Sequence, residues 1–409
     1  MLAALTTAAA LLAADAPGVS PEIADPSGRA LYGFHESLRR TAAKMQKTRI
    51  LFFGASHTAA DLLTGRLRDL LQQRFGDGGH GFFMPAKPWR SYRKHHLVLE
   101  APRRARDHWA WEFVRLRGEN RRDGLYGLAG MAVTASEKSQ WSKFRTATEG
   151  TLGSRASRLE LWYHRQPTGG DLWVHLKSEK RKQLLKTRGP SGLGIFETEL
   201  RDVAQRFEIV PKGNGPVRLY GGVLERDAQG VVLDNLGVNG SKAAAMLRWD
   251  EATWGRLAQR RDPALVVLAY GTNEAADEVQ PLGEYEMELR QVLDRIRRNL
   301  PRASCLLVGP TDHPVSQDEK VVRRDPGASK RFRARKRTYA VIDVQRRAAF
   351  SFGCGFYDHS AATGGTFSIV SWVDAEPQLA WHDYVHFTPE GYAVLGDRLA
   401  QALLRGYGK

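Results

Sequence analysis

Two kinds of hydrophobic pattern alternate in the first and last parts of the chain. Residues 50–53 and 264–270 are apolar without interruption, and each run is followed by a glycine. Continuous apolar runs that end at turn residues indicate buried strands of a parallel sheet. Elsewhere, apolar residues recur with the spacing of a helix face, over about 28–48, 60–74 and 282–300. This alternation predicts an α/β domain built on a parallel sheet.

The middle of the chain has a different pattern. From about residue 90 to 235, helical periodicity is lost and short runs of strand-forming residues are separated by turn residues. Many short strands at such spacing indicate a β-sandwich. We therefore predict a discontinuous α/β domain of residues 17–90 and 230–409, into which a β-sandwich of residues 91–229 is inserted. The strand-like runs are 96–99, 109–114, 159–163, 172–176, 207–210 and 217–220.

The first residues have the pattern of an export signal. Residues 1–16 are rich in alanine and leucine, and Ala14-Asp15-Ala16 fits the small-x-small pattern of a cleavage site. The apolar run is too short to span a bilayer, and the basic residues that usually precede such a run are missing. We predict a signal peptide over residues 1–16 and hence a periplasmic or secreted protein. A short alanine-rich tail is the alternative.

The net positive charge of the chain indicates which classes of binding partner to expect. Lys and Arg outnumber Asp and Glu by 61 to 45 among 409 residues, and the pI is near 9.9. Such a surplus favours anionic surroundings, for example a cell-envelope polymer, a lipid surface or nucleic acid. The sequence has no zinc-finger spacing, aromatic-rich RNA-binding signature or DNA-reading motif, so no nucleic-acid partner is expected. No cofactor is predicted.

The two cysteines, Cys305 and Cys354, each lie in a stretch with the pattern of a buried strand. They can form one disulfide in an oxidising compartment, but free cysteine is among the most buried residue types. We therefore interpret them as two buried thiols, and we predict no metal site.

The candidate chemistry of the α/β domain begins with Ser56. The predicted strand 50–53 ends at Gly54, and Ser56 follows directly before helix-favouring residues. A sharp turn from strand to helix places this hydroxyl at the carboxyl edge of the sheet, where ligands gather and the next helix presents free N–H groups. A serine held there is a good nucleophile if a base reaches it. A helix N-cap serine is the competing interpretation.

Two further segments lead to the same edge of the sheet. Gly240 lies in a turn before a predicted helix over 242–249, and a glycine lets its own N–H approach a bound oxygen. Asn273 follows the strand 264–270, and its side-chain amide can donate a hydrogen bond to a developing oxyanion. The structural alternatives are a simple tight turn at Gly240 and a turn residue at Asn273.

The last informative segment holds a candidate base. Asp383 and His386 are three residues apart, in a loop before Pro389. One turn can therefore place the carboxylate on one imidazole nitrogen and leave the other nitrogen free to take a proton from a serine. His382 is a competing base, although a side chain adjacent to Asp383 does not easily share its carboxylate in this geometry. A surface histidine is the alternative interpretation of His386.

Four short motifs resemble, in their order along the chain, the SGNH branch of the GDSL hydrolases. The resemblance covers about residues 28–90 and 230–405 and implies a three-layer α/β/α fold with a parallel sheet. The motifs are Gly54-x-Ser56, Gly240, Gly271-Thr272-Asn273 and Asp383-x-x-His386.

The resemblance also implies roles for these residues. The implied catalytic residues are Ser56 as nucleophile, His386 as general base and Asp383 as its partner. The implied oxyanion hole consists of the N–H groups of Ser56 and Gly240 and the side-chain amide of Asn273. One departure concerns Ala55, because the family usually has Asp at this position; the substitution puts the local support of the serine turn in question.

Longer runs, together with the inserted β domain, look most like the bacterial envelope branch of this family. Its members include peptidoglycan O-acetylesterases and related polysaccharide acetyl esterases, whose inserted module resembles a carbohydrate-binding domain. The resemblance predicts a serine esterase that removes O-acetyl groups from an anionic envelope glycan, in particular peptidoglycan, through an acyl-enzyme on Ser56. The runs are Gly54-x-Ser56-His57-Thr58-Ala59-x-Asp61 and Asp383-x-Val385-His386-Phe387-Thr388-Pro389-x-Gly391-Tyr392.

The inserted domain and the acyl-enzyme leave other functions open. Aromatic and basic residues of the insert, such as the run Lys177–Lys182 in a predicted loop, favour glycan binding, although most of the aromatic residues belong to a core. The same acyl-enzyme can pass its acetyl group to a sugar hydroxyl, which would make the protein an O-acetyltransferase. A glycan-binding protein without catalysis is the third hypothesis, suggested by Ala55 and the insert. The sequence does not specify the sugar, the acetylated position or the oligomeric state.

Overall fold

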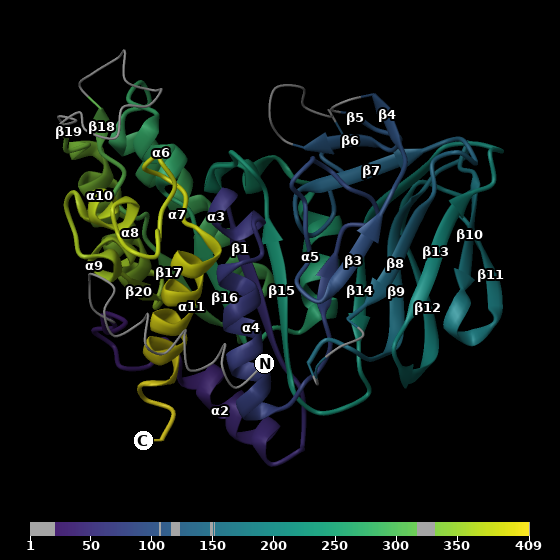
Figure 1. Cartoon of the computed structure of the whole chain (residues 1–409), viewed down its shortest axis with the longest axis horizontal. Coiled ribbons are helices and arrows are strands. Elements are labelled where there is room, and N and C mark those ends of the chain that lie inside the picture. The colour runs from purple at the N-terminus through teal and green to yellow at the C-terminus, as the bar shows by residue number, and fades with distance from the viewer. Residues whose placement is uncertain are drawn as a thin grey trace.

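The computed structural model describes residues 21–105, 108–115, 123–147, 150, 152–316 and 332–408 of the chain. Residues 1–16, the predicted signal peptide, lie outside this set. In Figure 1 the α/β part of the molecule lies beside a part built almost entirely of strands, and β1, β14 and β15 lie where the two parts meet.

A parallel sheet forms the centre of the α/β part. Within the described residues it has five strands in the order β15-β1-β16-β17-β20, and every neighbouring pair is parallel. The prediction of an α/β fold with a parallel sheet is confirmed. The strands are β1 (Thr48–Gly54), β15 (Val231–Gly237), β16 (Leu265–Ala269), β17 (Ser304–Val308) and β20 (Gly355–Tyr357).

Helices cover both faces of this sheet, because alternate residues of each strand face opposite sides. Ile50 and Phe52 belong to the core that α2, α4 and α11 cover, whereas Leu51 and Phe53 belong to the core on the side of α5, α7 and α8. The result is the three-layer α/β/α arrangement. The helices are α2 (Tyr32–Ala42), α4 (Leu63–Phe75), α11 (Pro389–Leu404), α5 (Glu251–Arg261), α7 (Leu282–Asn299) and α8 (Lys336–Ser351).

Several predicted helices differ from the observed ones at their ends. The predicted helix 28–48 is shorter, since the backbone turns at Lys44 (φ 58°) and β1 begins at Thr48. The predicted helix 60–74 begins three residues later, at Leu63, because the backbone turns at Asp61 (φ 47°), and a separate short helix over Ser56–Ala59 precedes this turn. The predicted helix 242–249 is a 3-10 helix. The remaining helices are α3 (Ser56–Ala59), α6 (Thr272–Ala276), α9 (His359–Thr363), α10 (Ser368–Val373), η1 (Lys177–Glu179) and η2 (Ala243–Arg248).

The middle of the chain forms two antiparallel sheets. Their orders in the described residues are β11-β10-β13-β8-β3 and β12-β9-β14-β7-β6, and β2 pairs with β14 beside the second sheet. The additional β sheets fit the expectation of an additional β domain. The strands are β2 (Gly81–Phe83), β3 (Leu97–Glu100), β6 (Glu112–Arg115), β7 (Met131–Ala135), β8 (Ser142–Thr146), β9 (Ala156–Arg165), β10 (Asp171–Leu176), β11 (Arg181–Lys186), β12 (Gly192–Val203), β13 (Arg206–Pro211) and β14 (Val217–Glu225).

Two small antiparallel strand pairs complete the strands of the described residues. They are β4 (Arg103–Ala105) with β5 (His108–Trp109), and β18 (Val315–Ser316) with β19 (Phe332–Arg333). The run Lys177–Lys182, which we predicted as a loop, spans η1 and the start of β11.

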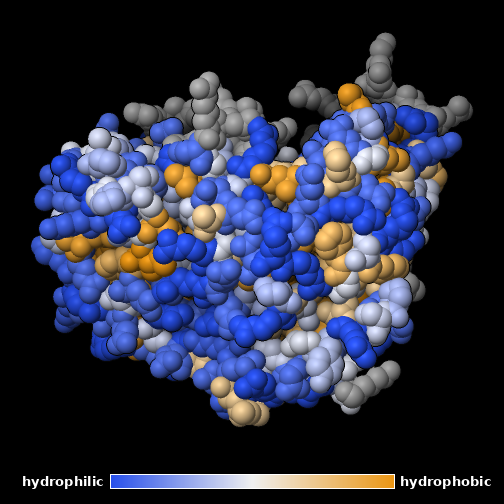
Figure 2. All heavy atoms as spheres, turned by 180° about the vertical axis from the view of Figure 1, so that it is seen from behind, coloured by the Kyte–Doolittle hydropathy of each residue, from blue (hydrophilic) through white to orange (hydrophobic). Residues whose placement is uncertain are grey.

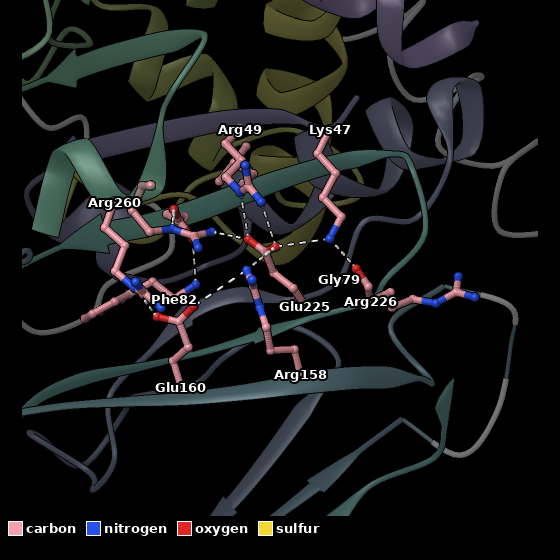
Figure 3. Close-up of polar contacts among 12 residues, drawn as sticks. Lys47, Arg49, Gly79, Phe82, Arg158, Glu160, Glu225, Arg226 and Arg260 are labelled. Carbon is pink, nitrogen blue, oxygen red and sulfur yellow. Dashed lines mark hydrogen bonds and ion pairs between the residues drawn. The ribbon is translucent and has the colours of Figure 1, made fainter. Parts of the chain in front are cut away.

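The two parts of the molecule share a core and a buried network of charges. Apolar residues of β1, β14 and β9 belong to one continuous cluster. Figure 3 shows Glu225, at the end of β14, surrounded by cationic side chains. The carboxylate of Glu225 is fully buried and lies 2.6 Å from Arg261, 2.9 Å from Arg49 and 3.0 Å from Arg158. Residues from both parts therefore satisfy a single buried charge.

The interpretation of the cysteines as two thiols is wrong. Cys305 on β17 and Cys354, directly before β20, form a disulfide, and their Cα atoms are 4.6 Å apart. The cause is topological: β17 and β20 are neighbours in the sheet although 49 residues separate the two cysteines. Sequence separation alone does not reveal this contact.

Most of the face seen in Figure 2 is hydrophilic, and hydrophobic side chains gather in a few patches on it. None of the helices in the described ranges combines the length and the apolar composition of a membrane span.

Candidate active site

The sharp turn that carries Ser56 depends on glycine at two strand ends. β1 ends at Gly54, and α3 begins two residues later with Ser56. A Cβ added at Gly54 would lie 2.0 Å from Thr58 Oγ1, and one added at Gly237, the end of β15, would lie 2.2 Å from a backbone nitrogen of α3. The absence of side chains at these two positions lets α3 pack on the sheet edge, with Ser56 at the carboxyl end of β1.

Three hydrogen bonds support this turn, at which the family usually has Asp in place of Ala55. Ala55 is buried, and its carbonyl accepts a hydrogen bond from the N–H of Ala59 at 2.9 Å. The side-chain amide of Asn235 on β15 donates to the carbonyl of Thr58 at 2.6 Å. In addition, the N–H of Val238 donates to the carbonyl of Gly54 at 2.9 Å. The turn is therefore held without a carboxylate at position 55.

The structure brings Ser56, His386 and Asp383 together in a connected line. Nε2 of His386 lies 2.8 Å from Oγ of Ser56, and Nδ1 of the same ring lies 2.7 Å from a carboxylate oxygen of Asp383. Both distances are those of good hydrogen bonds. The imidazole can thus accept the serine proton on one nitrogen while the carboxylate fixes the other, which is the arrangement that nucleophilic serine chemistry requires.

The loop that carries Asp383 and His386 is fixed at both ends. The N–H of Trp381 donates to the carbonyl of His386 at 2.8 Å, and Thr388 caps the N-terminus of α11 by accepting a hydrogen bond from the N–H of Gly391 at 3.2 Å. Burial raises the pKa of Asp383. Hydrogen bonds from the His386 ring and from backbone N–H groups together outweigh this effect, so the net pKa is below the ordinary value. The Asp383 side chain is therefore a carboxylate.

Gly240 and Asn273 lie on the same pocket as Ser56 and His386. The pocket has a volume of about 460 Å³ and lies at the carboxyl edge of the sheet. Gly240 has a φ of 71°, a left-handed conformation that favours glycine. The amide nitrogen of Asn273 donates to the carbonyl of Ser241 at 2.9 Å. Because an amide NH₂ has two hydrogens, one N–H remains for a bound oxygen.

A buried carboxylate joins the two loops that carry these donors. Glu274 accepts hydrogen bonds from the N–H of Gly271 at 2.9 Å and from the N–H of Ala243 at 2.8 Å. Burial raises the pKa of Glu274. The backbone hydrogen bonds lower it by a smaller amount, so the net pKa is above the ordinary value. The loop before η2 and the N-terminus of α6 are thereby held at a fixed separation.

His382 and His57, two further histidines of the motif segments, have different surroundings. His382, which we considered as a competing base, is exposed to solvent. His57 is buried, and its Nδ1 lies 2.9 Å from the hydroxyl oxygen of Tyr392. Burial, followed by the neighbouring His386, lowers the pKa of His57 far below its ordinary value, so this ring is neutral. Its centroid lies 5.2 Å from that of His386, which makes it a packing partner of the candidate base.

One wall of the pocket lies in a segment to which the sequence assigned no role. Trp89, Ser91 and Arg93 line the pocket, together with Trp381 from the loop before His386. The segment lies between β2 and β3 and has neither strand nor helix periodicity. Its only signal in the sequence is the presence of tryptophan and arginine in a polar stretch, which does not distinguish a pocket wall from an ordinary surface loop.

Part of the chain matches a known protein family. Residues 206–394 match the model of the GDSL-like Lipase/Acylhydrolase family. The matched range includes Gly240, Asn273, Asp383 and His386, whereas Ser56 precedes it. A search of the curated proteins finds no match.

Comparison with solved structures supports the fold. A structure of a peptidoglycan O-acetylesterase has a TM-score of 0.76 and 24% sequence identity, and the match covers 94% of this chain and 99% of that one. An acetyl xylan esterase has a TM-score of 0.30 and 14% identity, with 42% of this chain and 80% of that one covered. A family two carbohydrate esterase from Cellvibrio japonicus has a TM-score of 0.26 and 11% identity, with 76% and 98% covered. The likeness to the first structure extends over both parts of the molecule.

Two structural features agree with the family match to the second half of the chain. They are the three-layer α/β/α fold and the position of Ser56 at the carboxyl edge of its sheet. Residues 206–394 therefore match the GDSL-like Lipase/Acylhydrolase family, and the fold of the chain is that of the solved peptidoglycan O-acetylesterase.

Proposed function

We propose that this protein is a serine esterase that removes O-acetyl groups from a cell-envelope glycan, with peptidoglycan as the substrate. The observation that carries the proposal is the line of hydrogen bonds from Ser56 through His386 to Asp383, at 2.8 and 2.7 Å, beside a pocket with oxyanion donors. The likeness over 94% of the chain to a solved peptidoglycan O-acetylesterase supports the choice of substrate.

In the proposed mechanism, Ser56 forms an acyl-enzyme. Nε2 of His386 takes the Oγ proton while Oγ attacks the carbonyl carbon of the acetyl ester. The resulting oxyanion accepts hydrogen bonds from the N–H groups of Ser56 and Gly240 and from the amide of Asn273. His386 then gives its proton to the departing sugar oxygen, which leaves the acetyl group on Ser56.

Hydrolysis of the acyl-enzyme completes the cycle. His386 takes a proton from water, the hydroxide attacks the acetyl carbonyl through a second oxyanion in the same hole, and Ser56 Oγ leaves with the proton from His386. The products are acetate and the free enzyme. Asp383 remains a carboxylate throughout and stabilises the imidazolium that forms in each half of the cycle.

The walls of the pocket suit a charged glycan. Trp381 has 48% of its surface exposed at the pocket, and Trp89 lies on the wall formed by residues 89–93. Aromatic rings offer flat apolar faces for sugar rings. Arg93 is exposed on the same wall, and the whole chain has an excess of 61 cationic over 45 anionic residues. This charge attracts an anionic polymer such as peptidoglycan.

A location outside the cytoplasm, periplasmic or secreted, is part of the proposal. The disulfide between Cys305 and Cys354 supports it, because disulfides persist in oxidising compartments and are rare in the cytosol. The signal peptide over residues 1–16 remains a prediction from the sequence pattern. Mass spectrometry of the protein recovered from a periplasmic extract tests it: the proposal expects a mature chain that begins near residue 17.

Acetate release from isolated peptidoglycan tests the proposed function. We expect the purified protein to release acetate from O-acetylated peptidoglycan, and to release none after the ester groups have been removed by mild base. The Ser56→Ala variant should release no acetate, whereas Ser139→Ala, which changes an exposed serine of the insert, should match the wild type. Equal release by Ser56→Ala would contradict the proposal.

The same assay separates hydrolysis from transfer. With an oligosaccharide acceptor present, an esterase releases acetate in the amount of ester consumed, and an O-acetyltransferase forms acetylated oligosaccharide instead. Binding of the glycan without turnover would indicate a binding protein that lacks catalysis.

A further inference from the structure

Outside the pocket, three side chains with metal-binding atoms meet on the surface of the α/β part. Asp69 lies on α4, and His95 and His96 lie directly before β3. Nε2 of His95 is 2.7 Å from one carboxylate oxygen of Asp69, and Nε2 of His96 is 3.0 Å from the other. One ligand atom from each of the three side chains lies within 4.8 Å of the other two. Among the described residues, this is the group of His, Cys, Asp or Glu side chains whose spacing could hold a metal ion.

The backbone fixes the positions of both imidazoles. His96 has a φ of 62°, which is uncommon for a residue with a side chain, and its carbonyl accepts a hydrogen bond from the N–H of Ala147 at 2.9 Å. The N–H of His95 donates to the buried carboxylate of Asp61 at 2.7 Å. Non-glycine residues in such conformations persist only where the surrounding structure holds them, and they concentrate at functional sites.

Two glycines provide the space that the rings occupy. A Cβ added at Gly65 on α4 would lie 2.9 Å from Cγ of His95, and a Cβ added at Gly153 would lie 2.3 Å from Cβ of His96. The ring centroids of the two histidines are 3.8 Å apart. The imidazoles are therefore packed into fixed positions over Asp69, unlike the side chains of freely rotating surface histidines.

We propose that Asp69, His95 and His96 bind a divalent first-row transition ion, such as Zn²⁺. Two imidazole nitrogens and one carboxylate oxygen form a donor set that suits these ions, whereas Mg²⁺ and Ca²⁺ prefer oxygen ligands. The three side chains are partly exposed, so the remaining coordination positions are open to water.

The present distances fit this role after a small adjustment. Zinc bonds of about 2.0–2.2 Å place neighbouring ligand atoms somewhat more than 3 Å apart. The observed separations of 2.7 and 3.0 Å therefore need to open by only a few tenths of an ångström. On binding, the metal replaces the Nε2 protons that now face the carboxylate: a neutral imidazole then carries its proton on Nδ1, and an imidazolium releases one proton to solvent and keeps the other on Nδ1.

The position of the site gives it a structural consequence. Residues 89–93 form one wall of the substrate pocket, and His95 follows this wall after the buried Lys94. A metal ion on His95, His96 and Asp69 would fix the end of the wall to α4. The site is separate from the residues of the proposed catalytic mechanism, so it does not depend on the proposed function.

Calorimetric titration of the full chain with Zn²⁺ tests the proposal, provided that the protein carries no polyhistidine tag. We expect one ion per chain and a rise in the unfolding temperature with Zn²⁺, and no comparable binding of Mg²⁺ or Ca²⁺. Asp69→Asn and His95→Gln should each weaken Zn²⁺ binding by at least about tenfold. Their unfolding temperatures without metal show whether the variants remain folded, so two independent substitutions test the same site.

Two control variants identify the site that holds the ion. His386→Ala removes the histidine next to Ser56, and His175→Gln removes a histidine on β10 in the insert; both should bind Zn²⁺ as the wild type does. The proposal is overturned if Asp69→Asn and His95→Gln retain full affinity. It is also overturned if binding is lost in His386→Ala, because the ion would then lie at the serine pocket.

Discussion

Each ring nitrogen of His386 lies within hydrogen-bond distance of one side chain. Its Nδ1 lies 2.7 Å from Asp383, its Nε2 lies 2.8 Å from Ser56, and the neutral ring of His57 packs at 5.2 Å between centroids. A neutral neighbour does not oppose the charge that His386 gains when it takes a proton, whereas the Asp383 carboxylate favours that charge. These contacts suit His386 for the role of general base.

Replacement of Asp383 by Asn tests its proposed role. Without the carboxylate, the imidazolium of His386 loses its stabilising charge, and we expect kcat to fall by about 10²–10⁴ with little change in KM. Hydrolysis of a small aryl acetate measures both constants. His382→Gln, which changes the exposed neighbour, should retain activity; a similar loss in both variants would argue against a specific role for Asp383.

The lowered pKa of Asp383 also fixes the direction of the pH dependence. Because this pKa lies below the ordinary value of 3.8, the carboxylate stays ionised through neutral and mildly acidic solution. Protonation of Asp383 therefore removes activity only below that value, and a loss of kcat at higher pH belongs to another group. The pH profile of kcat for the wild type measures this.

The sequence pointed to several residues of the candidate active site, because each lies in a short motif. These residues are Ser56, Gly240, Asn273, Asp383 and His386. The spacing of Asp383 and His386 permits one turn to join them. The pairing of Cys305 with Cys354 could not be predicted, since it depends on which strands are neighbours. The support of the turn at Ala55 was also hidden, because part of it comes from a distant segment, through the side chain of Asn235 and the backbone N–H of Val238.

The junction between α3 and α4 depends on a buried ion pair. Asp61, where the chain turns between these helices, lies 2.9 Å from Arg68 and 3.8 Å from Lys94. It also accepts hydrogen bonds from Thr64 at 2.7 Å and from the N–H of His95 at 2.7 Å. Burial raises the pKa of Asp61, but the charges of Arg68 and Lys94 outweigh it and hold the pKa well below the ordinary value. This junction fixes α3, and hence the serine turn, relative to the pocket wall.

Asp61→Asn should destabilise the protein by about 3–5 kcal/mol, because it leaves the buried cation of Arg68 without its partner. Urea unfolding monitored by circular dichroism measures the free energy. Since the folded pKa is lowered, the stabilisation from Asp61 in the wild type is fully present above its unfolded pKa near 3.8 and is lost as the pH falls towards the folded pKa. The stability of the variant should therefore depend less on acid than that of the wild type, and equal acid sensitivity would contradict this account.

The types of elements were better predicted than their ends. Strands over 50–53 and 264–270 have continuous apolar patterns, and they appear as β1 and β16. The break between α3 and α4 was not predicted, because the helix-favouring residues from 57 to 74 have no Gly or Pro until Gly65. Asp61 adopts a φ of 47° there and meets Arg68 and Lys94, a tertiary arrangement that local propensity does not contain.

The α/β part and the β sheets form one body through the Glu225 network. Burial raises the pKa of Glu225, but the neighbouring cations, Arg261 first, together outweigh this effect and hold the pKa well below the ordinary value, so the residue is an anion inside the molecule. Arg261 also lies 2.7 Å from Asp234 on β15, which extends the network into the parallel sheet. The network thus fixes the orientation of the antiparallel sheets relative to the sheet that carries Ser56.

Glu225→Gln should lower the free energy of unfolding by about 3–5 kcal/mol, because the buried cation of Arg261 and the partly buried cations of Arg49 and Arg158 lose their common partner. Glu197→Gln is the matched control: Glu197 lies 2.5 Å from Arg260 at the edge of the same network, but its side chain is 42% exposed. Its loss should cost less than about 1 kcal/mol. Urea unfolding of both variants makes the comparison, and equal losses would show that burial does not determine the effect.

At the scale of the whole molecule, the sequence predicted an α/β fold and additional strands but not how they join. The pattern change near residue 90 indicates where the β sheets begin, yet β2 lies before this point and pairs with β14. The Glu225 network also joins residues far apart in the sequence. Both features depend on long-range contacts, and neither leaves a periodic pattern in the chain.

Covalent labelling tests the central claim, that Ser56 is an activated nucleophile, most directly. A fluorophosphonate that reacts with activated serines would be added to the purified protein, and the modified peptide would be identified by mass spectrometry. The account predicts one modified residue, Ser56, with labelling lost in His386→Ala. Labelling at another serine, or esterase activity that persists in a protein whose Ser56 is fully modified, would contradict it.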